Sequence, residues 1–310
     1  MCTETKLFDL VSWWSIWIVI GIGACLLLFD KLCKVRKVTE EANRFYYFLG
    51  IIAIVVGFLM ASLVQSFYNY LESVAKGNPK WEWGGVTFMG GLFGGVIAFV
   101  GGALIFAKGN VRAQFGQVCE IGLACVPTAH AFGRIGCFSV GCCYGAEVHE
   151  GDPFAFLGVT FKHGAGAGVL RYPTQLFEAV FLFILAGVCI LMVLKDKKFN
   201  SVIYFAAYGI FRFCLEFLRD DDRGVIGIGF VLTPSQVLSI VSVVIALLML
   251  TLILLKKYAP AAALKVAHFF RLDVPFNPEL EVKAALPESD DEEDENDLSE
   301  DEKDKDEDKQ

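Results

Sequence analysis

Two arginines within long apolar stretches are the residues of this chain best placed to do chemistry. Arg134 follows His130 by four residues near the end of one apolar run, and Arg212 precedes Glu216 by four residues in another. Charge at membrane depth is costly, so an ionisable side chain there indicates a functional site by default. Positions four apart share one face of a helix, so Arg212 and Glu216 can form an ion pair.

Each of these residues also has a purely structural explanation. Arg134 can extend to lipid phosphates at the membrane interface, as long basic side chains do. Arg212 and Glu216 can neutralise each other and simply hold helices together. His130 can be an ordinary packed residue near an interface. The choice depends on how the surrounding elements place these side chains.

The composition indicates a protein built from membrane-spanning helices. Hydrophobic residues make up 55 % of the chain and aromatic residues 14 %, and the mean hydropathy is positive. Several apolar stretches approach the roughly 20 residues that a helix needs to span a bilayer. We therefore expect an all-α polytopic membrane protein with its membrane domain over residues 1–258. The seven predicted spans are 11–30, 45–66, 86–107, 114–140, 174–194, 201–218 and 235–255.

The charges of the connecting loops predict how these spans are oriented. Basic residues are concentrated in the loop 30–44 and in the turns that follow the third, fifth and seventh spans. The positive-inside rule then places the N-terminus outside and the C-terminus in the cytoplasm. Residues 146–172 are expected to form a small extracytoplasmic head. Met1–Asp9 lacks the basic region of a signal peptide, so the first span should remain as an anchor.

The chain beyond the last span is strongly acidic. Residues 288–310 contain 15 acidic and 3 basic residues, whereas the whole chain has a formal net charge of −8. Such a composition cannot bury a core, so this tail is expected to be disordered and solvated. Residues 259–287 are expected to form a cytoplasmic juxtamembrane segment between the tail and the last span.

Three of the predicted spans carry polar groups to the same depth. At about 1.5 Å of rise per residue, the predicted orientations place all of these groups in the outer half of the membrane. Residues that extended to the interface one by one would not be expected to converge in this way. The converging residues are His130 and Arg134 in the fourth span, Gln175 and Glu178 in the fifth, and Arg212 and Glu216 in the sixth.

Four segments carry a resemblance to one family of membrane enzymes. They resemble, in the same order, motifs of the prolipoprotein diacylglyceryl transferases, and the resemblance covers about residues 11–255. The segments are Gly84–Gly95, Gly133–Gly145, Tyr172–Ala179 and Tyr208–Arg219. Trp14-Ser15 is a weaker match, near the position where the family usually has Tyr-Gly.

The resemblance implies an enzyme that moves a diacylglyceryl group from phosphatidylglycerol to the lipobox cysteine of a prolipoprotein, releasing glycerol phosphate. It implies that Arg134 and Arg212 hold the leaving phosphate and that Glu216 orients Arg212. It also implies that Gly145, Gln175 and Glu178 shape the lipid site together with Arg134. The implied location is the plasma membrane, and the implied partners are phosphatidylglycerol and prolipoprotein signal peptides. No cofactor, metal or nucleic acid is expected.

The chain departs from the family pattern on three counts. Met89 stands where the family usually has histidine, Cys137 where it usually has asparagine and Cys142 where it usually has glutamate. A methionine cannot take a proton, which leaves His130 as a candidate base at the right depth. Without a base, the arginines themselves would have to favour the thiolate form of the acceptor. Cys137, Cys142 and Cys143 fit no usual zinc spacing, so the sequence favours tight helix packing over a metal site.

Two other functions stay open at the level of sequence. One is a sister transferase that keeps the arginine site but passes the lipid group to a different acceptor. The other is a non-catalytic phospholipid-binding or transport protein. The spans show no inverted repeat and no paired broken helices of the kind that transporters use, which disfavours transport.

Overall fold

The computed structural model describes residues 6–7, 11–162, 164, 166–197, 199–220, 226–227 and 231–258. The predicted juxtamembrane segment 259–287 and the acidic tail 288–310 lie outside the described residues, as does His163. The chain divides into two units, Met1–Thr251 and Leu252–Gln310. Of the second unit only the last turns of one helix, residues 252–258, are described.

The described chain is mostly helical, as predicted. Its helices are α1 Trp13–Val35, α2 Glu40–Ala75, α3 Phe88–Phe106, α4 Gly109–Ala113, α5 Phe115–Ser139, α6 Thr174–Leu194, α7 Asn200–Glu216 and α8 Pro234–Tyr258. Three short antiparallel strand pairs occur, namely β1 Lys6–Leu7 with β2 Val11–Ser12, β3 Val159–Thr160 with β4 Leu170–Arg171, and β5 Ile226–Gly227 with β6 Val231–Leu232. Residues Ala155–Leu157 form a 3-10 turn.

Five of the helices, α1, α2, α5, α6 and α8, are long and apolar enough to cross a membrane. The apolar part of α3, Gly90–Phe106, is shorter, and α7 has 17 residues. Both coincide with predicted spans, but both fall below the roughly 20 residues that an upright span needs. The chain is therefore a membrane protein, and seven spans remain a prediction.

Side-chain caps fix where several helices begin. The Ser12 hydroxyl accepts from the Trp14 amide at 3.1 Å at the start of α1. At the start of α8, Thr233 Oγ1 accepts from the Gln236 amide at 3.2 Å, and Gln236 Oε1 accepts from the Thr233 amide at 3.0 Å. This reciprocal pattern is a capping box, which satisfies two backbone donors that the first helical turn leaves unpaired. Thr233 is thereby held firmly, which matters for the site described below.

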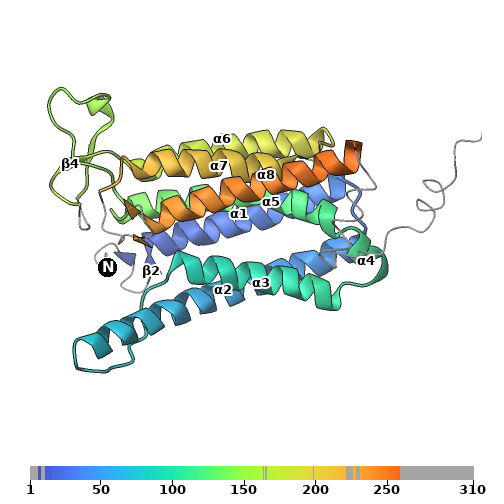
Figure 1. Ribbon diagram of the computed structural model, residues 1–310, viewed down its shortest axis with the longest axis horizontal. Helices are drawn as coiled ribbons and strands as arrows, with labels where there is room; N and C mark the ends of the chain where they lie inside the picture. The colour runs from blue at the N-terminus through green and yellow to red at the C-terminus, as the bar shows by residue number, and fades with distance from the viewer. Residues whose placement is uncertain are drawn as a thin grey trace, which may run out of the picture. The chain divides into compact units, whose positions relative to one another are not determined.

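Small residues let neighbouring helices approach closely. A Cβ atom on Gly21 of α1 would lie 2.8 Å from Phe132 Cβ on α5, and one on Gly90 of α3 would lie 2.7 Å from the Met60 carbonyl of α2. Any larger residue at either position would force the backbones apart. Figure 1 shows the result, with α1 running along α5 and with α2 beside α3.

The segment predicted as a head folds into a small hairpin. Its strands β3 and β4 pair antiparallel, with Val159 opposite Arg171. The Tyr172 hydroxyl donates to the Pro153 carbonyl at 2.6 Å, which ties the segment to the start of α6. The hairpin extends past the ends of the helices in Figure 1. This is the end at which α5 finishes, α6 begins and α7 finishes, so three helix termini meet below it.

Candidate active site

Glu178 of α6 is the carboxylate that links three helices. Its side chain is fully buried, and its Oε2 atom lies 3.1 Å from Arg134 Nε on α5. Its Oε1 atom accepts a hydrogen bond from the Tyr208 hydroxyl on α7 at 2.9 Å. The same oxygen lies 3.7 Å from His130 Nε2 and 4.0 Å from Arg212 Nε. Arg134 and Arg212, 78 positions apart in the chain, thus lie beside the same buried carboxylate.

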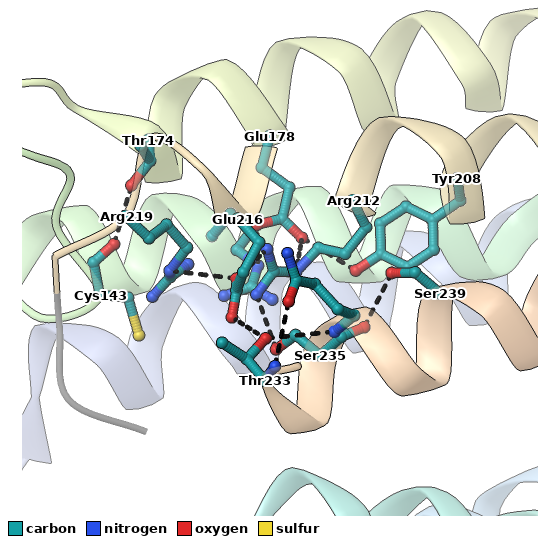
Figure 2. A network of polar contacts seen from close by, with 12 residues as sticks. Cys143, Thr174, Glu178, Tyr208, Arg212, Glu216, Arg219, Thr233, Ser235 and Ser239 are labelled. Carbon is teal, nitrogen blue, oxygen red and sulfur yellow. Dashed lines mark hydrogen bonds and ion pairs between the residues drawn. The ribbon is translucent and has the colours of Figure 1, made fainter. Parts of the chain in front are cut away.

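Glu216 of α7 forms a second centre next to the first. Arg212 Nη1 lies 2.7 Å from Glu216 Oε2, and Arg219 Nε lies 3.8 Å from the same oxygen. Thr233 at the start of α8 donates through its hydroxyl to Glu216 Oε1 at 2.7 Å. Arg212 Nη2 donates to the Ser235 hydroxyl at 3.0 Å. Figure 2 shows Arg212 between the two glutamates, so it connects both centres into one network.

The charged side chains of the network are mostly buried. Three guanidinium groups, those of Arg134, Arg212 and Arg219, face two carboxylates. The arginine side chains are 14 %, 6 % and 2 % exposed, so water screens their charge little. Guanidinium groups held together in this way suit an anionic ligand such as a phosphate.

Gly145 lies where the end of α5, the start of α6 and the end of α7 come together. Its amide donates to the Tyr172 carbonyl at 2.9 Å, and the next amide, that of Ala146, donates to the Leu218 carbonyl at 2.8 Å. A Cβ atom at position 145 would lie 2.7 Å from the Tyr172 carbonyl oxygen and 2.8 Å from that of Leu218. A glycine is therefore required here by the close approach of two other backbone segments.

The turn after α5 is fastened to the first turn of α6 by two side chains. Gln175 Nε2 donates to the Cys142 carbonyl at 2.6 Å, and the Thr174 hydroxyl donates to the Cys143 carbonyl at 3.0 Å. Both donors are fully buried. Because Glu178 follows one turn later on α6, these bonds hold the turn directly next to the charged network.

The structure brings together the polar residues that the depth argument placed in one layer. Predicted residues His130, Arg134, Glu178, Arg212 and Glu216 share the network, and Gln175 and Gly145 border it. Met89 lies in the first turn of α3, and its side chain lies outside the described residues.

Four members of the network were not predicted from the sequence, and one of them is Arg219, 3.8 Å from Glu216 Oε2. Tyr208, Thr233 and Ser235 donate to or accept from its charged groups. Tyr208 precedes Arg212 by four residues, and this spacing was an available signal. Thr233 and Ser235 come from the start of α8 and carry no such signal, because their contacts depend on how α8 packs against α7.

Comparison with known proteins gives one consistent result. Residues 6–252 match the sequence model of a family described as prolipoprotein diacylglyceryl transferase. A phosphatidylglycerol–prolipoprotein diacylglyceryl transferase of Clostridium tetani is 30 % identical over 237 residues, which cover 74 % of this chain and 88 % of that protein. Enzymes of the same name from Methylococcus capsulatus and Xylella fastidiosa are 29 % and 28 % identical, covering 77 % and 76 % of this chain and 90 % and 87 % of their own lengths.

Proposed function

The chain belongs to the prolipoprotein diacylglyceryl transferase family, and we propose that its buried arginine network is the site at which phosphatidylglycerol reacts. The enzyme transfers the diacylglyceryl group of this lipid to the lipobox cysteine of a prolipoprotein and releases glycerol phosphate. The observation that carries the assignment of the site is the convergence of two buried guanidinium groups, those of Arg134 on α5 and Arg212 on α7, on the fully buried Glu178.

The charge change of the reaction explains why such a network is useful. The acceptor sulfur attacks the glycerol carbon that carries the phosphate ester, so a carbon–sulfur bond forms. The carbon–oxygen bond breaks, and its electron pair stays on the phosphate oxygen. The phosphate therefore gains negative charge as it leaves. Fixed guanidinium groups in a site shielded from water stabilise that charge without having to reorganise.

Arg134 and Arg212 are the residues we assign to the phosphate. Arg134 meets Glu178 through Nε, and we assign its two terminal nitrogens to the phosphate. A guanidinium fork matches two phosphate oxygens at once. Glu216 holds Arg212 at 2.7 Å and thereby fixes its direction. Glu178 acts in the same way on Arg134, so both glutamates position arginines.

His130 and the two bordering residues complete the proposed site. His130 Nε2 lies 3.7 Å from Glu178 Oε1, the oxygen that Tyr208 and Arg212 also approach. We assign Gln175 and Gly145 to the lipid site, because they hold the turn after α5 against α6 beside the network. The lipid's glycerol region is assigned to this turn and the phosphate to the arginines.

Conservative arginine variants test the assignment. Purified protein in detergent is given phosphatidylglycerol and a lipobox peptide, and release of glycerol phosphate is measured. Arg134→Lys and Arg212→Lys should each reduce the rate by about 10²-fold or more. A lysine keeps the charge but loses the fork of Arg134 and cannot make the separate contacts of Arg212 with Glu216 and Ser235. Arg36→Lys is the matched control. Arg36 is also ion-paired, with Asp196, but it follows the C-terminal end of α1, far from the site.

The outcomes separate the candidate functions. Full activity in either variant would show that the phosphate does not bind to these arginines. Release of glycerol phosphate with an acceptor other than the lipobox peptide, and not with that peptide, would favour the sister transferase. Binding of phosphatidylglycerol without any turnover would favour a lipid-binding protein.

A further inference from the structure

Three cysteines that the proposed reaction does not use converge beside the arginine network. The Sγ atoms of Cys137, Cys142 and Cys143 all lie within 4.8 Å of one another, and all three residues are partly buried. Among the described residues, this is the one group of three or more histidine, cysteine or carboxylate side chains close enough to hold a metal ion. Their spacing in the sequence did not suggest it.

The end of α5 explains how the first two thiols meet. The Cys142 amide donates to the Cys137 carbonyl at 3.1 Å, and the Gly141 amide donates to the Phe138 carbonyl at 3.1 Å. Gly141 has a positive φ of 64°. These features define a Schellman motif, in which the side chain two positions after the cap lies over a side chain in the last helical turn. In this chain those two residues are Cys142 and Cys137.

Backbone contacts with α6 then hold the turn in place. Cys143 also has a positive φ, 65°, which directs the chain back across the end of the helix. Its carbonyl accepts from Thr174, and that of Cys142 accepts from Gln175. Two thiols from the turn and one from the helix are therefore presented together by a backbone fixed at both ends.

The distances suit a thiolate-binding metal ion. Zinc binds thiolates at about 2.3 Å in a tetrahedron, which corresponds to sulfur atoms about 3.8 Å apart. The observed separations need a contraction of about 1 Å at most, which small side-chain rotations provide. Thiolate sulfur selects zinc and other soft ions over magnesium or calcium. Structural zinc sites use four protein ligands, whereas sites with three protein ligands leave a position open for chemistry.

We propose that Cys137, Cys142 and Cys143 form a three-thiolate site for Zn²⁺, and that the acceptor thiol of the prolipoprotein occupies its fourth position. This rests on the proposed function. Cys137 follows Arg134 by three residues on α5, so it lies one turn further along the same face, about 4.5 Å along the helix axis. A sulfur bound there would lie between the metal and the phosphate held by the arginines.

The chemistry balances without an oxidant or reductant. The acceptor thiol releases its proton to solvent when its sulfur binds the metal, because a metal-bound thiol is deprotonated. That sulfur then forms the carbon–sulfur bond while the carbon–oxygen bond to phosphate breaks. The product is a thioether, a neutral and much weaker ligand, so it leaves the metal. The site also supplies an acceptor-activating group in a chain that has Met89 where the family usually has a histidine.

Cobalt is a direct probe of the proposed site. The full-length protein, purified in detergent with reductant, is titrated with Co²⁺, whose absorption reports tetrahedral thiolate ligation. We expect one ion per chain and at least a tenfold loss of affinity in Cys137→Ser, Cys142→Ser and Cys143→Ser. The matched control is Cys214→Ser, which changes an exposed cysteine of α7. A lipobox peptide should alter the cobalt spectrum, and the same peptide with serine in place of cysteine should not.

A measurement on the unmodified chain covers variants that fail to fold. Zn²⁺ should protect these three thiols from alkylation, as read by mass spectrometry of the digested protein. Absence of Co²⁺ binding by the reduced protein, or a disulfide within the trio in place of bound metal, would overturn the site. Unchanged glycerol phosphate release in a metal-free triple variant would overturn the acceptor role. Should Arg134→Lys stay active while the cobalt spectrum responds to the peptide, the phosphate assignment fails and the metal site stands.

Discussion

Glu178 shows how a single buried residue can determine the geometry of the whole site. It is fully buried, yet it touches His130 and Arg134 of α5 and Tyr208 and Arg212 of α7. A buried carboxylate is tolerated when its partners satisfy it, and removing one member of such a group leaves the others unbalanced. The site is therefore most sensitive at Glu178, which these four side chains share.

Replacing Glu178 by glutamine should disable the enzyme and weaken the fold. Glutamine has almost the same shape, so the change removes charge and leaves Arg134 without a counter-charge. We expect the rate of glycerol phosphate release to fall at least about 10²-fold and the protein to be destabilised by about 3 kcal/mol or more. The unfolding temperature in detergent measures the second effect. Glu72→Gln is the control, because Glu72 forms an exposed pair with Lys76 on α2 and should change neither quantity.

His130 should matter less than Glu178. Its contact with Glu178 is 3.7 Å, longer than that of Tyr208 or Arg134, and its ring packs edge-on against Tyr208 at 5.2 Å. We expect His130→Gln to reduce the rate by less than about tenfold and to leave the shape of the pH–rate profile unchanged. A general base contributes about 10² to 10⁴. A loss of that size, together with a lost inflection near neutral pH, would make His130 the base.

The sequence predicted contacts within one helix better than contacts between helices. Arg212 and Glu216 were expected to pair because they are four residues apart, and they do, at 2.7 Å. The sharing of Glu178 was not predicted, because its partners lie on α5 and α7. Which side chains meet there depends on the rotation of three helices about their axes, and no local pattern specifies that.

At the scale of elements, Gly145 is the point at which three helix ends are joined. Gly145→Ala should abolish activity, because the new Cβ atom would meet two carbonyl oxygens at 2.7 and 2.8 Å and separate the segments that carry the network. Rate and unfolding temperature should both fall. The control is Gly122→Ala in α5, where a Cβ atom meets nothing within 4 Å and alanine should slightly stabilise the helix. Normal activity in Gly145→Ala would mean that this junction tolerates movement.

The end of α2 was predicted at the wrong residue, because the apolar pattern and the helix end at different places. The second span was predicted to end at residue 66, but α2 continues to Ala75. The apolar pattern stops where a membrane would stop, whereas the helix stops only before Gly77, whose φ is +74°. In contrast, Gly90 and Gly94 do mark a close approach between helices, because a Cβ atom on either would lie less than 3 Å from Met60 of α2.

The first unit carries its site at one end of its helices. The ends of α5 and α7 and the start of α6 contribute the network, so α5 and α7 run in the same direction and α6 runs in the opposite one. In the proposed orientation the basic loops lie inside, so this end of the helices lies at the outer face. The lipid and the prolipoprotein signal peptide would then reach the site from that face.

Epitope tags on the intact chain test this orientation. A tag inserted at Gly151, in an exposed turn of the hairpin segment, should bind antibody in cells whose wall has been removed. A tag after Gln310 should bind only after the membrane is permeabilised, whereas one before Met1 should bind without it. With Met1 and Gly151 on the same side, an even number of spans precedes the hairpin, so α3 crosses together with α1, α2 and α5. With Gln310 on the other side, an odd number follows, so α7 crosses together with α6 and α8, although α3 and α7 are shorter than the other five. A shorter helix can span where the bilayer thins around it. Two termini accessible from the same side would instead mean an even number, and either α3 or α7 would then lie in the membrane without crossing it.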